Sequence, residues 1–247
     1  MTRTLVAVAT YNEIENLPAL VEEIFAYAPD VSLLVIDDNS PDGTGRWCEN
    51  KAATDQRIDC LHRSGKLGLG SATVAGLRYA LEKNFDFVIT MDADFSHHPR
   101  YLPQLRTGIE SNDGRQLDVM IGSRYTPDGG IEGWPLYRRW MSLAVNSYAR
   151  IMLGLSVKDC SGAYRCYRAT ILRQLDLGQI RSQGYSYLEE ILWRLKDCGA
   201  RFGETPIVFV DRQRGKTKIN WREALAAVIV ILQLGAIRWW RVVAKRR

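Results

Sequence analysis

The stretch VITMDADFSHHP, residues 88–99, begins as an apolar run and ends in two carboxylates that are one residue apart. A short run rich in β-branched and apolar residues is typical of a buried strand. Residues i and i+2 of a strand share a face, so Asp92 and Asp94 are expected to emerge together at the carboxyl end of the strand. The two negative charges repel each other there unless a cation lies between them. The stretch therefore predicts a strand that carries a ligand site at its end.

Similar short runs recur along the chain and alternate with segments of helical periodicity. We predict strands at 4–9, 31–36, 58–61, 85–91, 117–122 and 207–210 and helices at 16–28, 43–53, 71–83, 101–111, 136–153 and 187–198. Such alternation predicts an α/β fold, with a mostly parallel central sheet flanked by helices and ligands at the carboxyl ends of the strands. We find no repeat or clear linker, so one α/β domain is the simplest organisation.

Composition narrows the class of protein. The chain has 247 residues, of which 46% are hydrophobic, so it can bury a sizeable core. The first residues lead directly into a predicted strand, without the leader of a signal peptide, and we expect a cytoplasmic protein. Five cysteines, with no Cys-x-x-Cys pair, disfavour both a disulfide framework and a zinc site. We interpret them as reduced and structural.

The net charge of +5 is unevenly distributed along the chain. Residues 212–247 contain ten Lys or Arg and one acid, Glu223, which gives +9. The rest of the chain carries 23 basic and 27 acidic groups, which gives −4. The positive charge is therefore concentrated at the C-terminal end.

That end also contains an aliphatic run. Residues 224–237 number fourteen, with Gln233 as the one strongly polar residue, which is short of the ~20 residues that span a bilayer. Segments 238–241 and 245–247 place tryptophans and cations beside this run, as in an amphipathic helix at an anionic membrane surface. A terminal helix that packs on the core, with a solvated basic end, explains the pattern equally well. Segment 134–141 has the same mixture of aromatics and arginines, and the two together favour membrane contact. Binding of nucleic acid is disfavoured because the charge adjoins an aliphatic run.

Polar side chains also follow the first two predicted strands. The first strand ends in the sequence TYNE, residues 10–13, and the second in Asp37 and Asp38. Three such strand ends suit the recognition of a base, a ribose and a metal-bound diphosphate. Asp92 and Asp94 are hard oxygen ligands for Mg²⁺ or Mn²⁺, although an acidic turn or a helix N-cap is the structural alternative. The loop GKLGLG, residues 65–70, adds flexibility and a cation but matches neither the dinucleotide fingerprint nor a P-loop.

Taken together, these stretches resemble the dolichol-phosphate mannose synthases, which are inverting glycosyltransferases of family 2 with the GT-A fold. The matching pieces lie in family order at residues 10–17, 35–44, 65–70, 91–99, 122–125, 161–168 and 211–218. The chain departs from the family at Ala9, where proline is usual, and at Ser96, where some members have a metal-binding glutamine. The resemblance implies a Rossmann-like GT-A catalytic domain at 1–218 and a C-terminal amphipathic membrane-surface tail at 219–247. The tail lacks the transmembrane helices of some members, so the chain resembles the peripheral type.

The resemblance also implies a role for each matching residue. It assigns nucleotide-sugar binding to Ala9, Tyr11, Glu13, Ile36, Asp38, Lys66, Asp92, Ala93, Asp94, Arg212 and Lys218. Asp92 and Asp94 bind Mg²⁺ or Mn²⁺, and with Arg124 they form the catalytic set. The phosphate of the acceptor is bound by Arg124, Arg138 and Ser142. Core packing or a surface ion pair is the ordinary alternative for each residue alone, so their joint occurrence carries the interpretation.

The reaction implied by the resemblance is transfer of mannose from GDP-mannose to dolichyl or polyprenyl phosphate at the cytoplasmic face of a membrane. A lipid monophosphate is ionised at neutral pH, so we expect neither His97 nor His98 to act as a general base. A rival within the class uses UDP-glucose or another nucleotide sugar. A rival from another class is a non-catalytic membrane-surface adaptor. An accessory membrane subunit is a further candidate partner, and we expect no nucleic acid.

Overall fold

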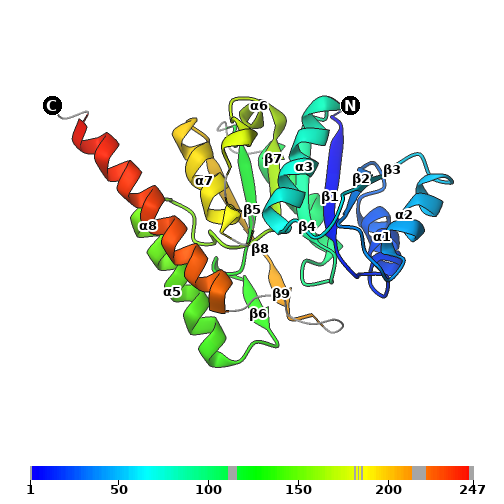
Figure 1. Cartoon of the computed structure of the whole chain (residues 1–247), viewed down its shortest axis with the longest axis horizontal. Helices are drawn as coiled ribbons and strands as arrows, with labels where there is room; N and C mark the ends of the chain where they lie inside the picture. The colour runs from blue at the N-terminus through cyan, green and yellow to red at the C-terminus, as the bar shows by residue number, and fades with distance from the viewer. Residues whose placement is uncertain are drawn as a thin grey trace.

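A seven-stranded sheet forms the centre of the computed structural model, which describes residues 2–110, 116–180, 182, 184, 186–212 and 221–244, with the side chains of 221–226 and 241–243 left undescribed. The strands lie in the order β3 (Ile58–His62), β2 (Ser32–Asp37), β1 (Thr4–Thr10), β4 (Phe87–Asp92), β7 (Arg165–Arg168), β5 (Val119–Ser123) and β8 (Phe202–Pro206) (Figure 1). Every neighbouring pair is parallel except the two pairs that contain β7. The predicted α/β class with a mostly parallel sheet is confirmed.

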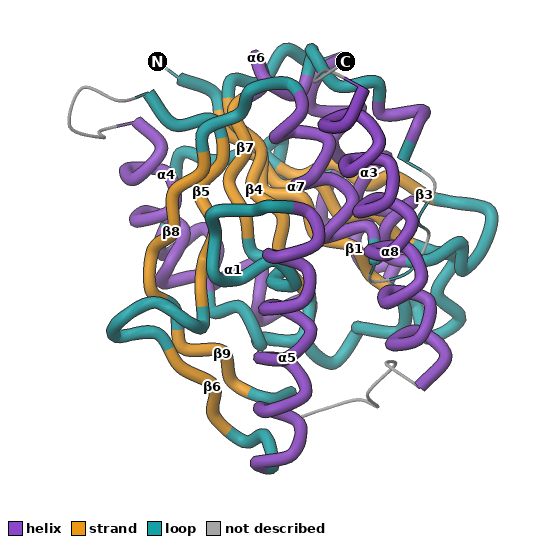
Figure 2. The backbone as a smooth tube through the Cα atoms, turned by 90° about the vertical axis from the view of Figure 1, so that its left-hand side faces the viewer, coloured by secondary structure: helices purple, strands orange, loops and turns teal. Residues whose placement is uncertain are grey.

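The helices follow the predicted alternation. They are α1 (Leu17–Tyr27), α2 (Thr44–Ala52), α3 (Leu69–Glu82), α4 (Leu102–Glu110), α5 (Leu136–Leu153), the short α6 (Ala169–Leu172), α7 (Tyr187–Asp197) and α8 (Trp221–Ala244). All six predicted helices and all six predicted strands are present, with boundaries within two residues. Strands β7, β8 and β6 (Gly130–Glu132) were not predicted, because they are short and lack the apolar pattern. β6 pairs with β9 (Val208–Val210) beside the first turns of α5 (Figure 2).

Side chains of the sheet alternate between two buried faces, as the period of a strand requires. On β1, Leu5 and Ala7 pack in the core that contains α3 and α7, whereas Val6 and Val8 pack in the core that contains α1 and α4. All four side chains are 3% exposed or less. Burial of both faces explains why these strands read as continuous apolar runs in the sequence.

The chain turns sharply after the three strands with polar ends. Asn12 after β1 and Asn39 after β2 both have φ of 58°, and Phe95 after β4 has φ of 62°. Asparagine enters this left-handed region readily, but a bulky residue such as phenylalanine rarely does. These turns keep the polar residues beside the carboxyl ends of the strands.

The tail helix α8 packs on the domain. It lies against α5 and α7, and in Figure 1 it runs beside α5 and extends past its end toward the C-terminus. Ile231 and Leu234 are buried in the core that contains α3 and α7. Arg238 donates from Nη1 to the carbonyls of Ile151 and Met152, at 3.2 and 3.1 Å, and so satisfies acceptors in the last turn of α5.

A second face of α8 stays exposed. Its exposed large side chains are Ile229, Leu232, Ile237, Trp239 and Trp240, at 43–74% of their full area. One face of α8 packs on the domain, as the core-packing interpretation expects, and the membrane-surface interpretation of the tail stays a prediction. Among the described residues, no helix has both the length and the apolar character needed to cross a membrane. The division into domains at residue 218 remains a prediction.

Candidate active site

A cavity of about 100 Å³ lies at the carboxyl ends of β1, β2 and β4. Its wall includes nine of the eleven predicted nucleotide-sugar residues, namely Ala9, Tyr11, Glu13, Asp38, Lys66, Asp92, Ala93, Asp94 and Arg212. Ile36 is not among the lining residues, because its side chain is 1% exposed and packs in the core. Lys218 lies outside the described residues. We call this cavity the donor pocket.

Two loops close one side of the donor pocket. Asp38 Oδ1 accepts a hydrogen bond from Arg63 Nη1 at 2.8 Å, and its Oδ2 accepts from the Leu67 N–H at 3.1 Å. Burial raises the pKa of Asp38, although Arg63 opposes the shift. Lys66 Nζ lies 4.7 Å from the centroid of the Tyr11 ring, a cation–π distance. The glycine loop thus contacts residues that follow both β1 and β2.

The turn after β4 orients the two central carboxylates. Asp94 Oδ1 accepts from the Ser96 N–H at 3.1 Å, and the N–H of Asp92 donates to His97 Nδ1, also at 3.1 Å. Phe95, which lies between Asp94 and Ser96 in the chain, has a left-handed backbone conformation that costs roughly 1–3 kcal/mol for such a residue. Strain of this size persists where the surrounding structure determines the backbone, as it does here at the edge of the donor pocket.

The two histidines have structural roles. His97 is 2% exposed, and its ring lies 5.0 Å from that of Tyr164 and 5.5 Å from that of Phe209. Burial lowers the pKa of His97, so the ring is neutral, and Nδ1 is the acceptor of the Asp92 N–H. The 3.5 Å approach of that nitrogen to Asp92 Oδ2 is therefore not an ion pair. His98 Nδ1 accepts from the Arg100 N–H and caps a short 3₁₀ turn.

A metal ion fits the Asp92–Asp94 pair only with help from other ligands. Burial raises the pKa of Asp92, and the neighbouring charge of Asp94 adds to the shift, so a cation would relieve both effects. In the part of the chain that is described, no group of three or more His, Cys, Asp or Glu could hold a metal. Two carboxylates with open positions suit Mg²⁺ or Mn²⁺ bound beside a diphosphate. Arg212 Nη2 lies 3.0 Å from Asp94 Oδ2 and provides a positive charge at this spot.

A second cavity of about 210 Å³ adjoins the donor pocket and shares Asp92 and Arg212 with it. All three predicted acceptor residues, Arg124, Arg138 and Ser142, line this acceptor cavity. Apolar side chains complete much of its wall, and they are Trp134, Met141, Val145, Leu188, Phe209 and Ala227. The combination of arginines with an apolar wall suits a ligand that has a phosphate at one end and a hydrocarbon chain at the other.

Arg124 is held rigidly in the acceptor cavity. Its Nε and Nη2 donate to the two carboxylate oxygens of Asp159, both at 2.7 Å, and Nη2 also donates to Ser161 Oγ at 2.8 Å. Asp159 is fully buried and also accepts from the Gly162 N–H at 2.9 Å. Burial alone would raise the pKa of Asp159, but the Arg124 charge and hydrogen bonds hold it below its usual value. The Arg124 backbone N–H also donates to Asp159 Oδ2, at 3.1 Å. The pair is therefore ionised, and four donors fix the position of the Asp159 carboxylate.

The other two acceptor residues are less tightly held. Arg138 Nη1 lies 3.3 Å from Asp211 Oδ2, and the guanidinium carbon lies 4.1 Å from the centroid of the Trp134 ring. Ser142 Oγ accepts from the Tyr125 hydroxyl at 2.7 Å. Contacts of this kind leave Arg138 able to reorient toward a bound anion.

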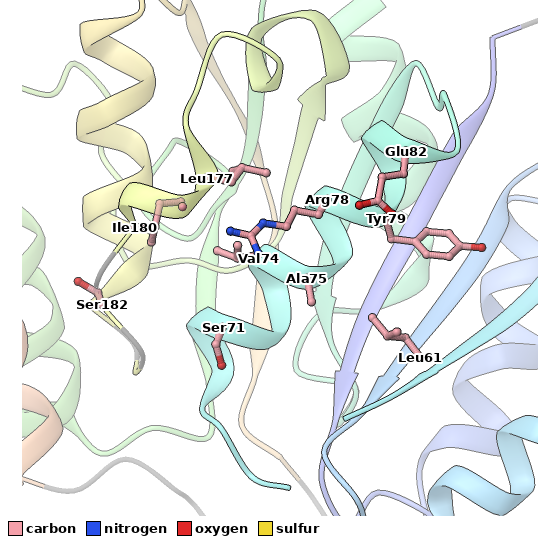
Figure 3. A pocket seen from close by; sticks show the side chains of 11 residues that line it. Leu61, Ser71, Val74, Ala75, Arg78, Tyr79, Glu82, Leu177, Ile180 and Ser182 are labelled. Carbon is pink, nitrogen blue, oxygen red and sulfur yellow. The ribbon is translucent and has the colours of Figure 1, made fainter. Parts of the chain in front are cut away.

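A larger cavity of about 550 Å³ lies away from these residues, between α3 and the segment before α7. Figure 3 shows the Arg78 side chain extending from α3 toward Leu177 and Ile180. The wall of this cavity contains none of the predicted site residues. We therefore place the candidate active site at the two smaller, adjoining cavities.

Comparison with known proteins identifies the family. Residues 5–176 match the family model described as glycosyl transferase family 2. The chain belongs to that family. The family 2 relatives include an undecaprenyl-phosphate mannosyltransferase from Micrococcus luteus, 42% identical over 238 residues that cover 96% of each chain. A polyprenol monophosphomannose synthase from Mycolicibacterium smegmatis is 39% identical over 230 residues, which cover 92% of this chain and 85% of the relative.

Solved structures show that this family 2 chain has the GT-A fold. The mannosyltransferase PcManGT from Pyrobaculum calidifontis, in complex with GDP-Man and Mn²⁺, superposes with a TM-score of 0.62 at 17% identity, over 96% of this chain and 64% of that one. Glucosyl-3-phosphoglycerate synthase from Mycobacterium tuberculosis, in complex with Mn²⁺, UDP and glucosyl-3-phosphoglycerate, superposes with a TM-score of 0.65 at 18% identity, over 94% of this chain and 80% of that one. At these identities the likeness establishes the fold alone.

Several residues of the candidate active site were not predicted from the sequence. Asp159 lies two residues before the SGAYRCYR motif, at residues 161–168, and forms an ion pair with the buried Arg124. Trp134 and Phe209 meet edge to face, with their ring centroids 5.3 Å apart, although the segments that carry them are distant in the sequence. Glu189 in the wall of the acceptor cavity followed from no motif. Each of these residues depends on a contact between segments far apart in the chain.

Proposed function

We propose that the protein is a metal-dependent inverting glycosyltransferase that moves mannose from GDP-mannose to a polyprenyl or dolichyl phosphate. The observation that carries the proposal is that the donor pocket and the acceptor cavity meet at Asp92 and Arg212. A carboxylate pair on one side and a set of arginines on the other suit a metal-bound diphosphate and an attacking phosphate. The similarity to two polyprenyl-phosphate mannosyltransferases supports the choice of sugar and acceptor.

On the donor side, Asp92 and Asp94 would hold Mg²⁺ or Mn²⁺, which neutralises the charge of a leaving diphosphate when it is bound. The presence of Mn²⁺ in two structural neighbours supports a divalent cation. Arg212 would exchange its contact with Asp94 for the diphosphate as the donor enters. Tyr11, Glu13 and Asp38 would contact the base and ribose, and Lys218 would close over the donor.

On the acceptor side, Arg124 and Arg138 would bind the lipid phosphate and align one of its oxygens with C1 of the sugar. The fixed geometry of Arg124 gives orientation, and the looser Arg138 contact lets the site close on the phosphate. A phosphate monoester is ionised at neutral pH, so the buried, neutral His97 has no proton to remove. In-line attack from the acceptor cavity inverts the configuration at C1.

The lipid acceptor implies work at a membrane surface. The N-terminal half of α5 carries exposed apolar side chains around the acceptor residues, namely Leu136, Tyr137, Trp140, Met141 and Leu143, at 39–71% of their full area. Trp239 and Trp240 of α8 are equally open. These faces would hold the protein on the cytoplasmic face of a membrane while the acceptor phosphate enters beside Arg138. An accessory membrane subunit is compatible with the same surface.

The test is transfer of radiolabelled sugar into an organic-extractable lipid by the purified protein with Mn²⁺ and polyprenyl phosphate. GDP-mannose and UDP-glucose are compared side by side, with Asp94→Ala as the inactive variant and Glu22→Ala, an exposed acid on α1, as its matched control. We expect label from GDP-mannose, lost in Asp94→Ala and kept in Glu22→Ala. Label from UDP-glucose alone would contradict the donor assignment, and no label from either would favour the adaptor.

A further inference from the structure

Glu189 is a buried carboxyl group with one oxygen that has no hydrogen-bond partner among the described residues. It lies in the first turn of α7 and is 3% exposed, and its side chain lines the acceptor cavity. Its Oε2 is buried and has no hydrogen-bond partner among the described residues. The adjacent Glu190 is equally buried but well satisfied, since it accepts from Ser182 Oγ at 2.6 Å and from Arg194 Nε at 2.8 Å. Two neighbouring glutamates are therefore buried for different reasons.

The cations near Glu189 are engaged elsewhere. Arg124 is bound to both carboxylate oxygens of Asp159. Arg165 donates from its two terminal nitrogens to the carbonyls of Leu188 and Cys160, at 2.9 and 2.7 Å. Burial raises the pKa of Glu189 to about 7, and a hydrogen bond from its own backbone N–H and the charges of the two arginines oppose this shift only in part. An apolar side chain of similar volume would fill this position at a lower cost in stability.

The position of Glu189 in the wall indicates what it binds. A transferred sugar must lie between the diphosphate, at Asp92 and Arg212, and the acceptor phosphate, at Arg124 and Arg138. All four of these residues line the same cavity as Glu189. A carboxyl group is a poor partner for either phosphate, because an ionised carboxylate repels it. A sugar hydroxyl suits the carboxyl in both protonation states, since it donates to the ionised form and accepts from the protonated form.

We propose that Glu189 binds a hydroxyl group of the sugar that is transferred and thereby contributes to the selection of that sugar. The proposal rests on the proposed function, because it takes the acceptor cavity as the place where sugar and acceptor meet. It gives a partner to the Glu189 oxygen that has none among the described residues. A site built around a polar group discriminates against a ligand that cannot pair with it.

The first test is the affinity for GDP-mannose relative to GDP, measured by calorimetry with Mn²⁺ in the wild type, in Glu189→Leu and in Glu189→Gln. We expect the affinity for GDP to be unchanged and the advantage of GDP-mannose over GDP to fall roughly tenfold in Glu189→Leu, the scale of one lost hydrogen bond to a charged or buried group. Glu189→Gln keeps the shape and part of the hydrogen bonding, so it should lose less. If the affinity for GDP-mannose relative to GDP were the same in all three proteins, the proposal would be overturned.

Glu190→Gln is the matched control, because it alters an adjacent buried glutamate that accepts hydrogen bonds from Ser182 and Arg194. It should lower the melting temperature and leave the GDP-mannose to GDP ratio unchanged. Glu189→Leu should keep or raise the melting temperature, since it removes a buried carboxyl whose Oε2 has no partner in the described structure. If the affinity for GDP-mannose relative to GDP fell equally in Glu189→Leu and in Glu190→Gln, Glu189 would have a merely structural role.

The second test identifies the hydroxyl. Deoxy analogues of GDP-mannose, each without one hydroxyl, are bound to the wild type and to Glu189→Leu. We expect one analogue to bind weakly to the wild type and to lose nothing further in the variant, because both changes remove the same contact. Additive losses for every analogue would overturn the proposal. If UDP-glucose proves to be the donor, the affinities for UDP-glucose and UDP are compared in the wild type and in Glu189→Leu. This comparison tests the role of Glu189 separately from the identity of the donor.

Discussion

Arg212 and Asp94, which are 118 positions apart in the chain, form an ion pair in the donor pocket, with Nη2 of the arginine 3.0 Å from Oδ2 of the aspartate. The guanidinium contacts the same carboxylate that we expect to bind the metal. A metal ion bound there would therefore compete with Arg212 for Asp94 until a diphosphate offered the arginine another anion. Such competition would link entry of the donor to assembly of the metal site.

Replacing Arg212 separates its two roles. In Arg212→Gln we expect Mn²⁺ alone to bind a few-fold more tightly than to the wild type, because a competing cation has been removed. Binding of GDP-mannose with Mn²⁺ should weaken about tenfold or more, because a charge-assisted contact to the diphosphate is lost. Titration followed by the electron paramagnetic resonance of free Mn²⁺ measures the first effect, and calorimetry measures the second. Arg46→Gln, at an exposed position on α2, is the control. Unchanged affinity for Mn²⁺ in Arg212→Gln would argue against the competition.

The Arg124–Asp159 pair is expected to stabilise the fold as well as the site. Asp159→Asn leaves a buried guanidinium without its counter-charge, which costs on the order of 3–5 kcal/mol of the free energy of unfolding. For a chain of this size that lowers the melting temperature by about 10 °C. Asp211→Asn breaks the looser, partly exposed pair with Arg138 and should cost less than about 1 kcal/mol. Thermal unfolding of the two variants measures the difference, and equal losses would contradict the role assigned to burial.

Glu189 predicts a pH dependence of stability. Its pKa is about 7 in the folded protein, above its usual value of 4.5, so between these values the folded state binds more protons than the unfolded state. Its contribution to stability is therefore fully present below pH 4.5 and is lost as the pH rises through 7, by an amount on the order of 3 kcal/mol. Denaturant unfolding of the wild type and of Glu189→Gln should show the wild type losing stability relative to the variant over this range. A difference that does not vary with pH would count against the raised pKa.

The exposed tryptophans test the membrane surface. Trp140 on α5 and Trp239 on α8 are 70% and 71% exposed, so the double variant Trp140→Glu with Trp239→Glu should fold as stably as the wild type. Its binding to anionic vesicles, measured by flotation, should fall at least about tenfold, since two large apolar side chains no longer enter the interface. Transfer to a long polyprenyl phosphate should slow, and transfer to a short, water-soluble acceptor should not. Tyr27→Glu, at an exposed aromatic on α1, is the control. Unchanged binding to vesicles in the double variant would show that these faces do not dock on membranes.

Local pattern was sufficient for most of the fold. The strands at the centre of the sheet are runs of apolar residues because both of their faces are buried. The helices have one apolar face because only one face of each helix is buried. β7 escaped prediction because Arg165 and Arg168 bracket a strand of four residues. The buried Arg165 is accommodated by carbonyl groups of Leu188 and Cys160, which no local pattern reveals.

The sequence by itself determined the alternation of strands and helices and the carboxylates at the strand ends, because period and motif are properties of neighbouring residues. Only the tertiary structure decided which charges pair. Asp159 lies 35 positions from Arg124, and the energy of each ion pair depends on distance and burial. The same holds for Glu189, which lines the acceptor cavity with one carboxyl oxygen that has no partner among the described residues. Charge and shape combine into a site only after the chain has folded, since folding sets both the separations and the dielectric surroundings.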